Sequence, residues 1–136
     1  MTIKSSKTLV DEALKEVKSL ELNEVKELID NKSCTMVDVR DIREIYNEGG
    51  IANALHIPRG MLEFWVDPQS QFYQHDKFDD EKKIILFCDL GARSALATKA
   101  LKDMGFKKVA HVKGGYRAMA ASGIFQLTQL TKKKKK

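Results

Sequence analysis

The residues best suited to chemistry lie in one short segment, Cys88-Asp89-Leu90-Gly91-Ala92-Arg93-Ser94. An unbroken apolar run precedes it at residues 84–87, which predicts a strand buried on both faces. After the segment, apolar residues recur at helical spacing as far as Met104, which predicts a helix that Gly105 ends. The cysteine therefore stands at the carboxyl end of a strand and beside the amino end of a helix.

Such a position favours a reactive thiol. Free backbone N–H groups and the positive end of the helix dipole converge there and stabilise a thiolate. We therefore expect the sulfur of Cys88 to be ionised, exposed and nucleophilic. Gly91 gives the turn the freedom to fold its amides around one point. The alternative is an inert buried thiol, which is common for a lone cysteine, but the glycine and the arginine at these offsets favour the reactive site.

The same segment resembles the active-site loop of the rhodanese family of sulfurtransferases, which reads Cys-x-x-Gly-x-Arg-Ser and opens a helix. The resemblance implies that Cys88 takes a sulfane sulfur from a donor, holds it as a persulfide, and passes it to cyanide or a thiol. The expected donor is a small sulfur-containing anion such as thiosulfate, or a protein persulfide. No cofactor is implied. The remaining loop residues would surround the substrate: Asp89, Leu90, Gly91, Ala92, Arg93 and Ser94.

A second segment resembles another signature of that family. This signature is an Asp-Val-Arg strand followed by the pattern Gly-x-Ile-x-x-Ala-x-x-Ile-Pro. Here it comprises Asp38-Val39-Arg40 and the stretch from Gly50 to Pro58, without the histidine that commonly follows the glycine. By resemblance, Asp38 and Arg40 anchor the loops near the site through hydrogen bonds and an ion pair. A direct catalytic role for either is the alternative.

The segment after Pro58 contributes further candidates. Phe64 and Trp65 are bulky for a surface connection, and we expect a short helix here to place them in the wall of a pocket over Cys88, with ordinary packing as the alternative. Arg59 either attracts an anionic donor or pairs with Glu63 four residues later.

Strands alternate with helices along the whole chain. This pattern predicts an α/β domain with a mainly parallel central sheet flanked by helices on both faces. Ligands bind such sheets at the carboxyl ends of the strands, which is where Cys88 stands. We expect an amphipathic helix in residues 1–18 that packs on the domain, a rhodanese-like domain in residues 19–125, and a disordered lysine-rich tail in residues 126–136.

Composition excludes several classes of function. Hydrophobic residues make up 43% and charged residues 32% of the 136 residues, as in an ordinary soluble domain. The five lysines at residues 132–136 account for the whole formal charge of +5, so the domain lacks the basic surface that nucleic acids require. No stretch is apolar enough for a membrane span, and the start lacks the apolar core of a signal peptide.

The cysteines and histidines point to a metal-free protein of the reducing cytoplasm. Cys34 and Cys88 do not form a disulfide framework, and Cys34 is either a packing residue or a resolving thiol for Cys88. His56 and His111 fall within predicted strands, where a structural role is expected. With so few dispersed histidines and no cysteine pair at ligand spacing, we expect no metal.

Two other functions compete with sulfur transfer. Cysteine-dependent phosphatases and arsenate reductases carry five residues between cysteine and arginine, whereas only four separate Cys88 from Arg93. A loop of this length suits a single sulfur better than a tetrahedral phosphate. The other alternative is a non-catalytic or redox-sensing rhodanese module that binds a partner protein. Because Asp89 adds negative charge beside the nucleophile, we expect it to oppose the thiolate and to make activity on thiosulfate modest.

Overall fold

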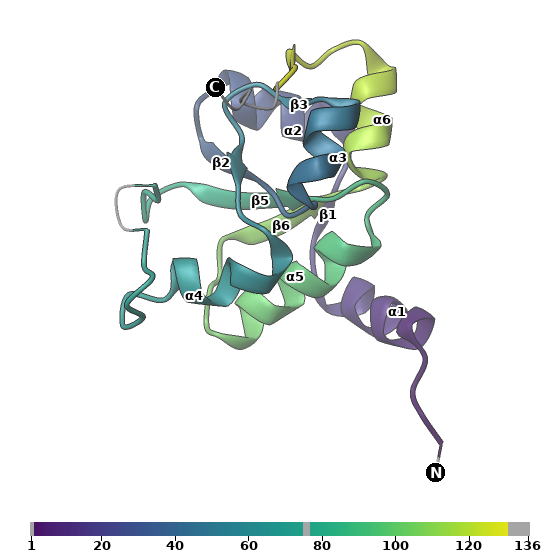
Figure 1. The fold of residues 1–136 in the computed structure, drawn as a ribbon, viewed down its shortest axis with the longest axis vertical. Helices are drawn as coiled ribbons and strands as arrows, with labels where there is room; N and C mark the ends of the chain where they lie inside the picture. Colours follow the sequence, from purple (N-terminus) through teal and green to yellow (C-terminus); the bar gives the residue numbers. More distant parts are fainter. Residues whose placement is uncertain (1, 75–76, 131–136) are drawn as a thin grey trace, which may run out of the picture.

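A parallel sheet forms the centre of the computed structural model, which describes residues 2–74 and 77–130 (Figure 1). The strand order is β1-β6-β5-β2-β4, and every pairing of these described strands is parallel. The predicted α/β class with a mainly parallel sheet is therefore confirmed. The five strands are β1 (Ser19–Leu20), β2 (Cys34–Asp38), β4 (Leu55–His56), β5 (Lys83–Phe87) and β6 (Val109–Val112).

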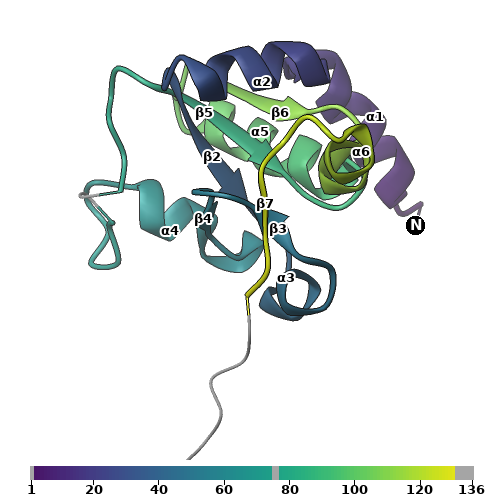
Figure 2. The same cartoon turned by 90° about the horizontal axis from the view of Figure 1, so that it is seen from above.

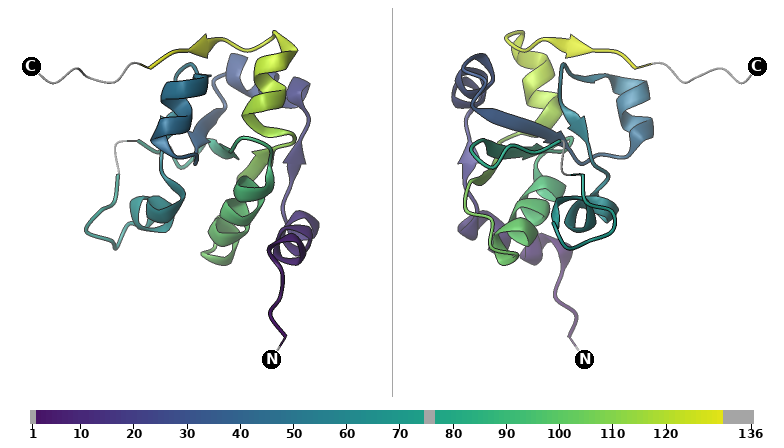
Figure 3. Two further views of the ribbon diagram at one scale, coloured as in Figure 1. Left: turned by 45° about the vertical axis from the view of Figure 1, so that its right-hand side comes forward. Right: turned by 90° about the vertical axis from the view of Figure 1, so that its left-hand side faces the viewer.

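Helices cover both faces of the sheet, as predicted (Figures 1 and 3). One face carries α1 (Ser6–Glu16), the short η1 (Arg59–Met61) with α4 (Leu62–Val66), and α5 (Ala92–Asp103). The other carries α2 (Leu22–Asp30), α3 (Ile42–Glu48) and α6 (Gly115–Ser122). Among the described residues, no helix combines the length and the apolar character needed to cross a bilayer.

The apolar run of β5 is unbroken because it contributes to two cores. Ile85 and Phe87 belong to the cluster that contains Val25 of α2 and Met119 of α6. Ile84 and Leu86 belong to the opposite cluster, with residues of α4 and α5. Successive side chains of a strand point to opposite faces, so a strand covered on both sides has no polar alternation.

The ordered chain extends beyond residue 125, the predicted end of the domain. Strand β7 (Leu127–Thr128) pairs antiparallel with β3 (Gly50–Ile51), so the chain is ordered against the domain beyond that point (Figure 2). Phe125 is buried in the same core cluster as Ile51, which brings the following backbone alongside β3. The expected disordered tail therefore does not begin at residue 126, and residues 131–136 lie outside the described part of the chain.

The N-terminal helix packs on the domain through a narrow face. Helix α1 contacts α5 and buries Ala13 completely, whereas Leu14 remains 42% exposed. Strand β1 stops at Leu20, because Glu21 caps α2 in a capping box with Glu24.

Helix α6 begins directly against the end of β5. Gly115, at φ +64°, lies so close to the loop that an added Cβ would stand 2.5 Å from the carbonyl oxygens of Cys88 and Asp89. The following N–H groups donate to those carbonyls, Tyr116 to Cys88 at 2.7 Å and Arg117 to Asp89 at 3.1 Å. The position of the candidate nucleophile therefore depends on a glycine at the start of α6.

This contact predicts the effect of adding one methyl group. Gly123 also has a positive φ, of +75°, but an added Cβ there would meet nothing within 4 Å. Gly123→Ala should lower the free energy of unfolding by about 1–2 kcal/mol through backbone strain alone. Gly115→Ala should lower it by at least about 2 kcal/mol more, because the backbone must move. Urea denaturation measures both values, and equal losses would contradict the close contact.

Candidate active site

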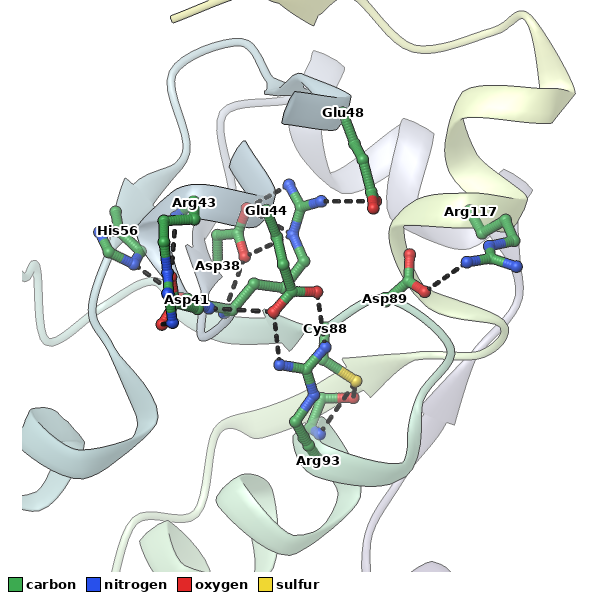
Figure 4. A network of polar contacts seen from close by, with 12 residues as sticks. Asp38, Asp41, Arg43, Glu44, Glu48, His56, Cys88, Asp89, Arg93 and Arg117 are labelled. Carbon is green, nitrogen blue, oxygen red and sulfur yellow. Dashed lines mark hydrogen bonds and ion pairs between the residues drawn. The ribbon is translucent and has the colours of Figure 1, made fainter. Parts of the chain in front are cut away.

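The side chain of Cys88 turns beneath the loop that joins β5 to α5 (Figure 4). The N–H of Gly91 donates to Sγ at 3.1 Å, and the N–H of Ser94 donates at 3.3 Å. Gly91 adopts φ +118°, a left-handed conformation that glycine reaches without a steric penalty. Two main-chain N–H groups and the amino end of α5 thus surround the sulfur, an arrangement that stabilises negative charge there.

The sulfur is not exposed, and that prediction is wrong. Cys88 is only 1% exposed and belongs to the apolar cluster that includes Val39, Ile57 and Ala97. The loop covers the sulfur from outside because its N–H groups fold inward, and the side chain of Leu90 points outward, 62% exposed.

Arg93 is held by a glutamate from another helix. Its guanidinium forms a two-point ion pair with Glu44 of α3, with Nη1–Oε1 2.7 Å and Nη2–Oε2 2.8 Å. These hydrogen bonds raise the pKa of Arg93 above its ordinary value and lower the pKa of Glu44. Glu44 also accepts the N–H of Asp41 at 3.2 Å, in the capping box that begins α3. Arg93 is therefore directed toward α3.

Asp89, which was expected to oppose the thiolate, forms an ion pair as well. Its Oδ2 accepts a hydrogen bond from Nη2 of Arg117 at 2.8 Å, and its side chain is 15% exposed. The cation compensates the negative charge that Asp89 brings next to the sulfur.

Asp38 and Arg40 form a buried ion pair close to the loop. Arg40 Nη2 donates to Asp38 Oδ2 and to the carbonyl oxygen of Gly49, both at 2.8 Å. The guanidinium also lies 4.1 Å from the centre of the Tyr116 ring. The N–H of Tyr116 in turn donates to the carbonyl of Cys88. The ion pair therefore contacts the loop through Tyr116, in line with the structural role expected from the sequence.

The structure does not bring the candidates after Pro58 to Cys88. Arg59 pairs with Glu63 at 2.7 Å, so of its two expected roles the ion pair is present. Phe64 is 51% exposed and makes an edge-on contact with Phe72. Trp65 lines a separate cavity of about 240 Å³ with Ile57 and other residues. Helix α4 lies away from the loop between β5 and α5 (Figure 1), so the expected aromatic wall over Cys88 is wrong.

Cys34 lies at the opposite end of the sheet. It pairs in register with Lys83 at the start of β5, whereas Asp38 pairs with Phe87 at the end. Four intervening steps along a strand separate these ends by about 13 Å. Cys34 is therefore not placed to act as a resolving thiol within one chain. Burial raises the pKa of its thiol.

His111 lies in a strand, as the sequence predicted, but the sequence did not reveal its partners. It is 2% exposed, with Nδ1 2.9 Å from Ser94 Oγ and Nε2 2.8 Å from Ser19 Oγ. Strand β6 pairs with β5, and this register carries His111 beside the start of α5. Within residues 2–74 and 77–130, no group of three histidine, cysteine, aspartate or glutamate side chains could hold a metal ion.

Comparisons with solved structures show similar folds. A structure from Rhodopseudomonas palustris, of a protein of unknown function described as a possible tyrosine phosphatase, is 39% identical with a TM-score of 0.83 and covers 90% of this chain and 95% of that one. The human single-domain sulfurtransferase TSTD1 is 26% identical with a TM-score of 0.65, covering 77% of this chain and 96% of that one.

Among curated proteins, the tRNA uridine(34) hydroxylase of Yersinia enterocolitica is 33% identical over 96 residues, or 71% of this chain. The chain spans only 26% of the length of that relative. The family model described as the rhodanese-like domain matches residues 21–122, which include the Cys88 loop, the core cluster to which Cys88 belongs and the Asp38–Arg40 pair. The chain belongs to the family of rhodanese-like domains.

Proposed function

We propose that this protein is a sulfurtransferase that carries a sulfane sulfur as a persulfide on Cys88. The observation that supports the proposal is the pair of N–H groups, from Gly91 and Ser94, that point at Sγ from the start of α5. The donor is a small sulfur-containing anion or a protein persulfide, and the acceptor is a thiol or cyanide. Reduced Cys34 and Cys88 suit a reducing compartment such as the cytoplasm.

The chemistry needs a good nucleophile that is also a good leaving group. The Cys88 thiolate attacks the outer sulfur of the donor, the new S–S bond forms, and the old bond breaks with its electron pair leaving on the donor. From thiosulfate that leaving group is sulfite. An acceptor thiolate then attacks the outer sulfur of the persulfide and releases Cys88 as a thiolate. The same N–H groups stabilise the sulfur anion before and after each transfer.

The geometry supports sulfur transfer over phosphate ester hydrolysis. A phosphatase loop directs its arginine at the phosphate held over the cysteine, whereas Arg93 is engaged by Glu44. Cys88 is 1% exposed, so a single terminal sulfur reaches it more readily than a tetrahedral phosphate.

The charges around the loop bear on the choice of donor. Arg93 and Arg117 are paired with Glu44 and Asp89, so neither is free to attract a doubly charged anion. We therefore propose that thiosulfate is a modest donor and that a persulfide is a better one. The reason differs from the one expected from the sequence, because Asp89 is itself compensated.

A mass measurement tests the carrier. The reduced protein incubated with thiosulfate or with a small-molecule persulfide should gain one sulfur atom. Cys88→Ser should abolish the gain because the nucleophile is lost. Cys34→Ser is the matched control and should retain it. A gain that persists in Cys88→Ser would refute the site, and a wild-type protein that gains nothing from either donor would be a partner-binding or redox-sensing module.

Kinetics test the role of the paired arginine. Glu44→Gln removes the negative charge that holds Arg93, so the KM for thiosulfate should fall about threefold, the value of a weak surface ion pair. Glu63→Gln releases Arg59 in the same way but far from the loop, and should leave the KM unchanged. Equal effects of the two variants would show that only the net charge of the protein matters.

A further inference from the structure

A continuous line of polar contacts leads from the buried sulfur to the surface. Cys88 Sγ lies 3.5 Å from Ser94 Oγ, which lies 2.9 Å from His111 Nδ1. On the other side of the ring, His111 Nε2 lies 2.8 Å from Ser19 Oγ. Cys88, Ser94 and His111 are at most 2% exposed, whereas Ser19 is exposed. Ser19 and His111 come from strands β1 and β6, Ser94 comes from α5, and Cys88 comes from the loop that follows β5.

The outer end of this line opens into a cavity. Ser19 and His111 both line a hollow of about 470 Å³ between α1, the loop and β6. The cavity is polar at this corner, with Glu21 and Lys113 beside it, and is large enough for water. The thiol of Cys88, by contrast, has almost no surface of its own through which to lose a proton.

A neutral imidazole has one N–H, which can lie on either ring nitrogen. The hydrogen bonds along this line can therefore run in two opposite directions, which we call its two polarities. In the first, the Cys88 thiol donates to Ser94 Oγ, the Ser94 hydroxyl donates to Nδ1 of His111, and Nε2–H donates to Ser19. In the second, every hydrogen bond is reversed: Ser19 donates to Nε2, Nδ1–H donates to Ser94, and Ser94 donates to a thiolate. Each polarity corresponds to one protonation state of Cys88.

We propose that His111 is a positioning residue that couples the ionisation of Cys88 to the cavity through a proton relay. The thiol proton moves to Ser94 Oγ as the Ser94 hydroxyl proton moves to Nδ1. The Nε2 proton moves to Ser19 Oγ as the Ser19 hydroxyl proton moves to water. The net change is one thiolate and one proton in the cavity, with the ring neutral before and after.

Other contacts are consistent with this relay. Burial lowers the pKa of His111, which keeps the ring neutral with a single N–H to place. Ser94 Oγ also lies 3.1 Å from the carbonyl oxygen of Gly91. In the second polarity, this carbonyl oxygen and the thiolate both accept from the Ser94 hydroxyl. The charged groups near the line are already paired with one another: Arg93 with Glu44, Asp89 with Arg117, and Lys113 with Glu21.

The relay deepens the proposed function, because it concerns the thiolate on which sulfur transfer rests. Its test needs no sulfur donor, however. A protein that alkylates normally at Cys88 but gains no sulfur would contradict the function alone, and an unaltered pH profile would contradict the relay alone.

The first measurement is the rate of Cys88 alkylation by iodoacetamide as a function of pH, in a Cys34→Ser background. His111→Leu removes the N–H that supports the Ser94 hydroxyl, so the midpoint of the profile should rise by about one pH unit, with about tenfold slower alkylation near neutral pH. His111→Asn retains an N–H at the place of Nδ1 and should keep most of the wild-type midpoint. His56→Leu, the matched control in β4, should leave it unchanged. A His111→Leu protein that is folded by circular dichroism yet keeps the wild-type midpoint would overturn the proposal.

The second measurement requires no substitution at position 111. Nitrogen NMR of isotopically labelled histidine in the otherwise wild-type chain should show the proton of His111 on Nε2 at low pH and on Nδ1 once Cys88 has ionised. The change should follow the alkylation midpoint and disappear in Cys88→Ser. A tautomer that stays the same across this range would overturn the relay even if His111→Leu did not fold.

Discussion

The main chain at Cys88 and Asp89 lies between the amino ends of two helices, and the rest of the site depends on this placement. Helix α6 supplies the N–H groups of Tyr116 and Arg117 to the two carbonyls, and α5 supplies the N–H of Ser94 to the sulfur. The first N–H groups of a helix have no partner within it and must find acceptors elsewhere. Here one loop provides acceptors for both helices, so the sulfur is held by main-chain groups whose positions the fold determines.

Ion pairs around the loop reinforce this placement and remove free charge from it. Two of these pairs, Glu44–Arg93 and Asp89–Arg117, join segments that are far apart in the sequence. The third, Asp38–Arg40, joins residues two positions apart at the end of β2. The buried pair is Asp38–Arg40. A buried ion pair contributes little net stability because the cost of desolvation offsets the attraction, but removing one partner is costly because the other charge is left buried and unpaired. The groups that point at the sulfur are therefore main-chain N–H groups and not charged side chains. The pairs are Asp38–Arg40, Glu44–Arg93 and Asp89–Arg117.

The local structure around Cys88 was predictable because it is encoded by neighbouring residues. An apolar run, a glycine-containing turn and apolar residues at helical spacing specify a strand, a turn and a helix, and these are β5, the loop and α5. The cap of α3 at Asp41 was predictable for the same reason. The strand after residue 125 was not, because β7 is two residues long and exists only by pairing with β3.

The sequence by itself therefore determined the fold class, the family and the loop that carries Cys88. Only the tertiary structure decided that the sulfur is buried, that Glu44 holds Arg93, that Arg117 compensates Asp89, and that His111 meets Ser94. The physical reason is the distance along the sequence over which each interaction acts. Backbone conformation follows from residues a few positions apart, whereas the partners of these side chains come from strands and helices that the sheet order β1-β6-β5-β2-β4 brings together.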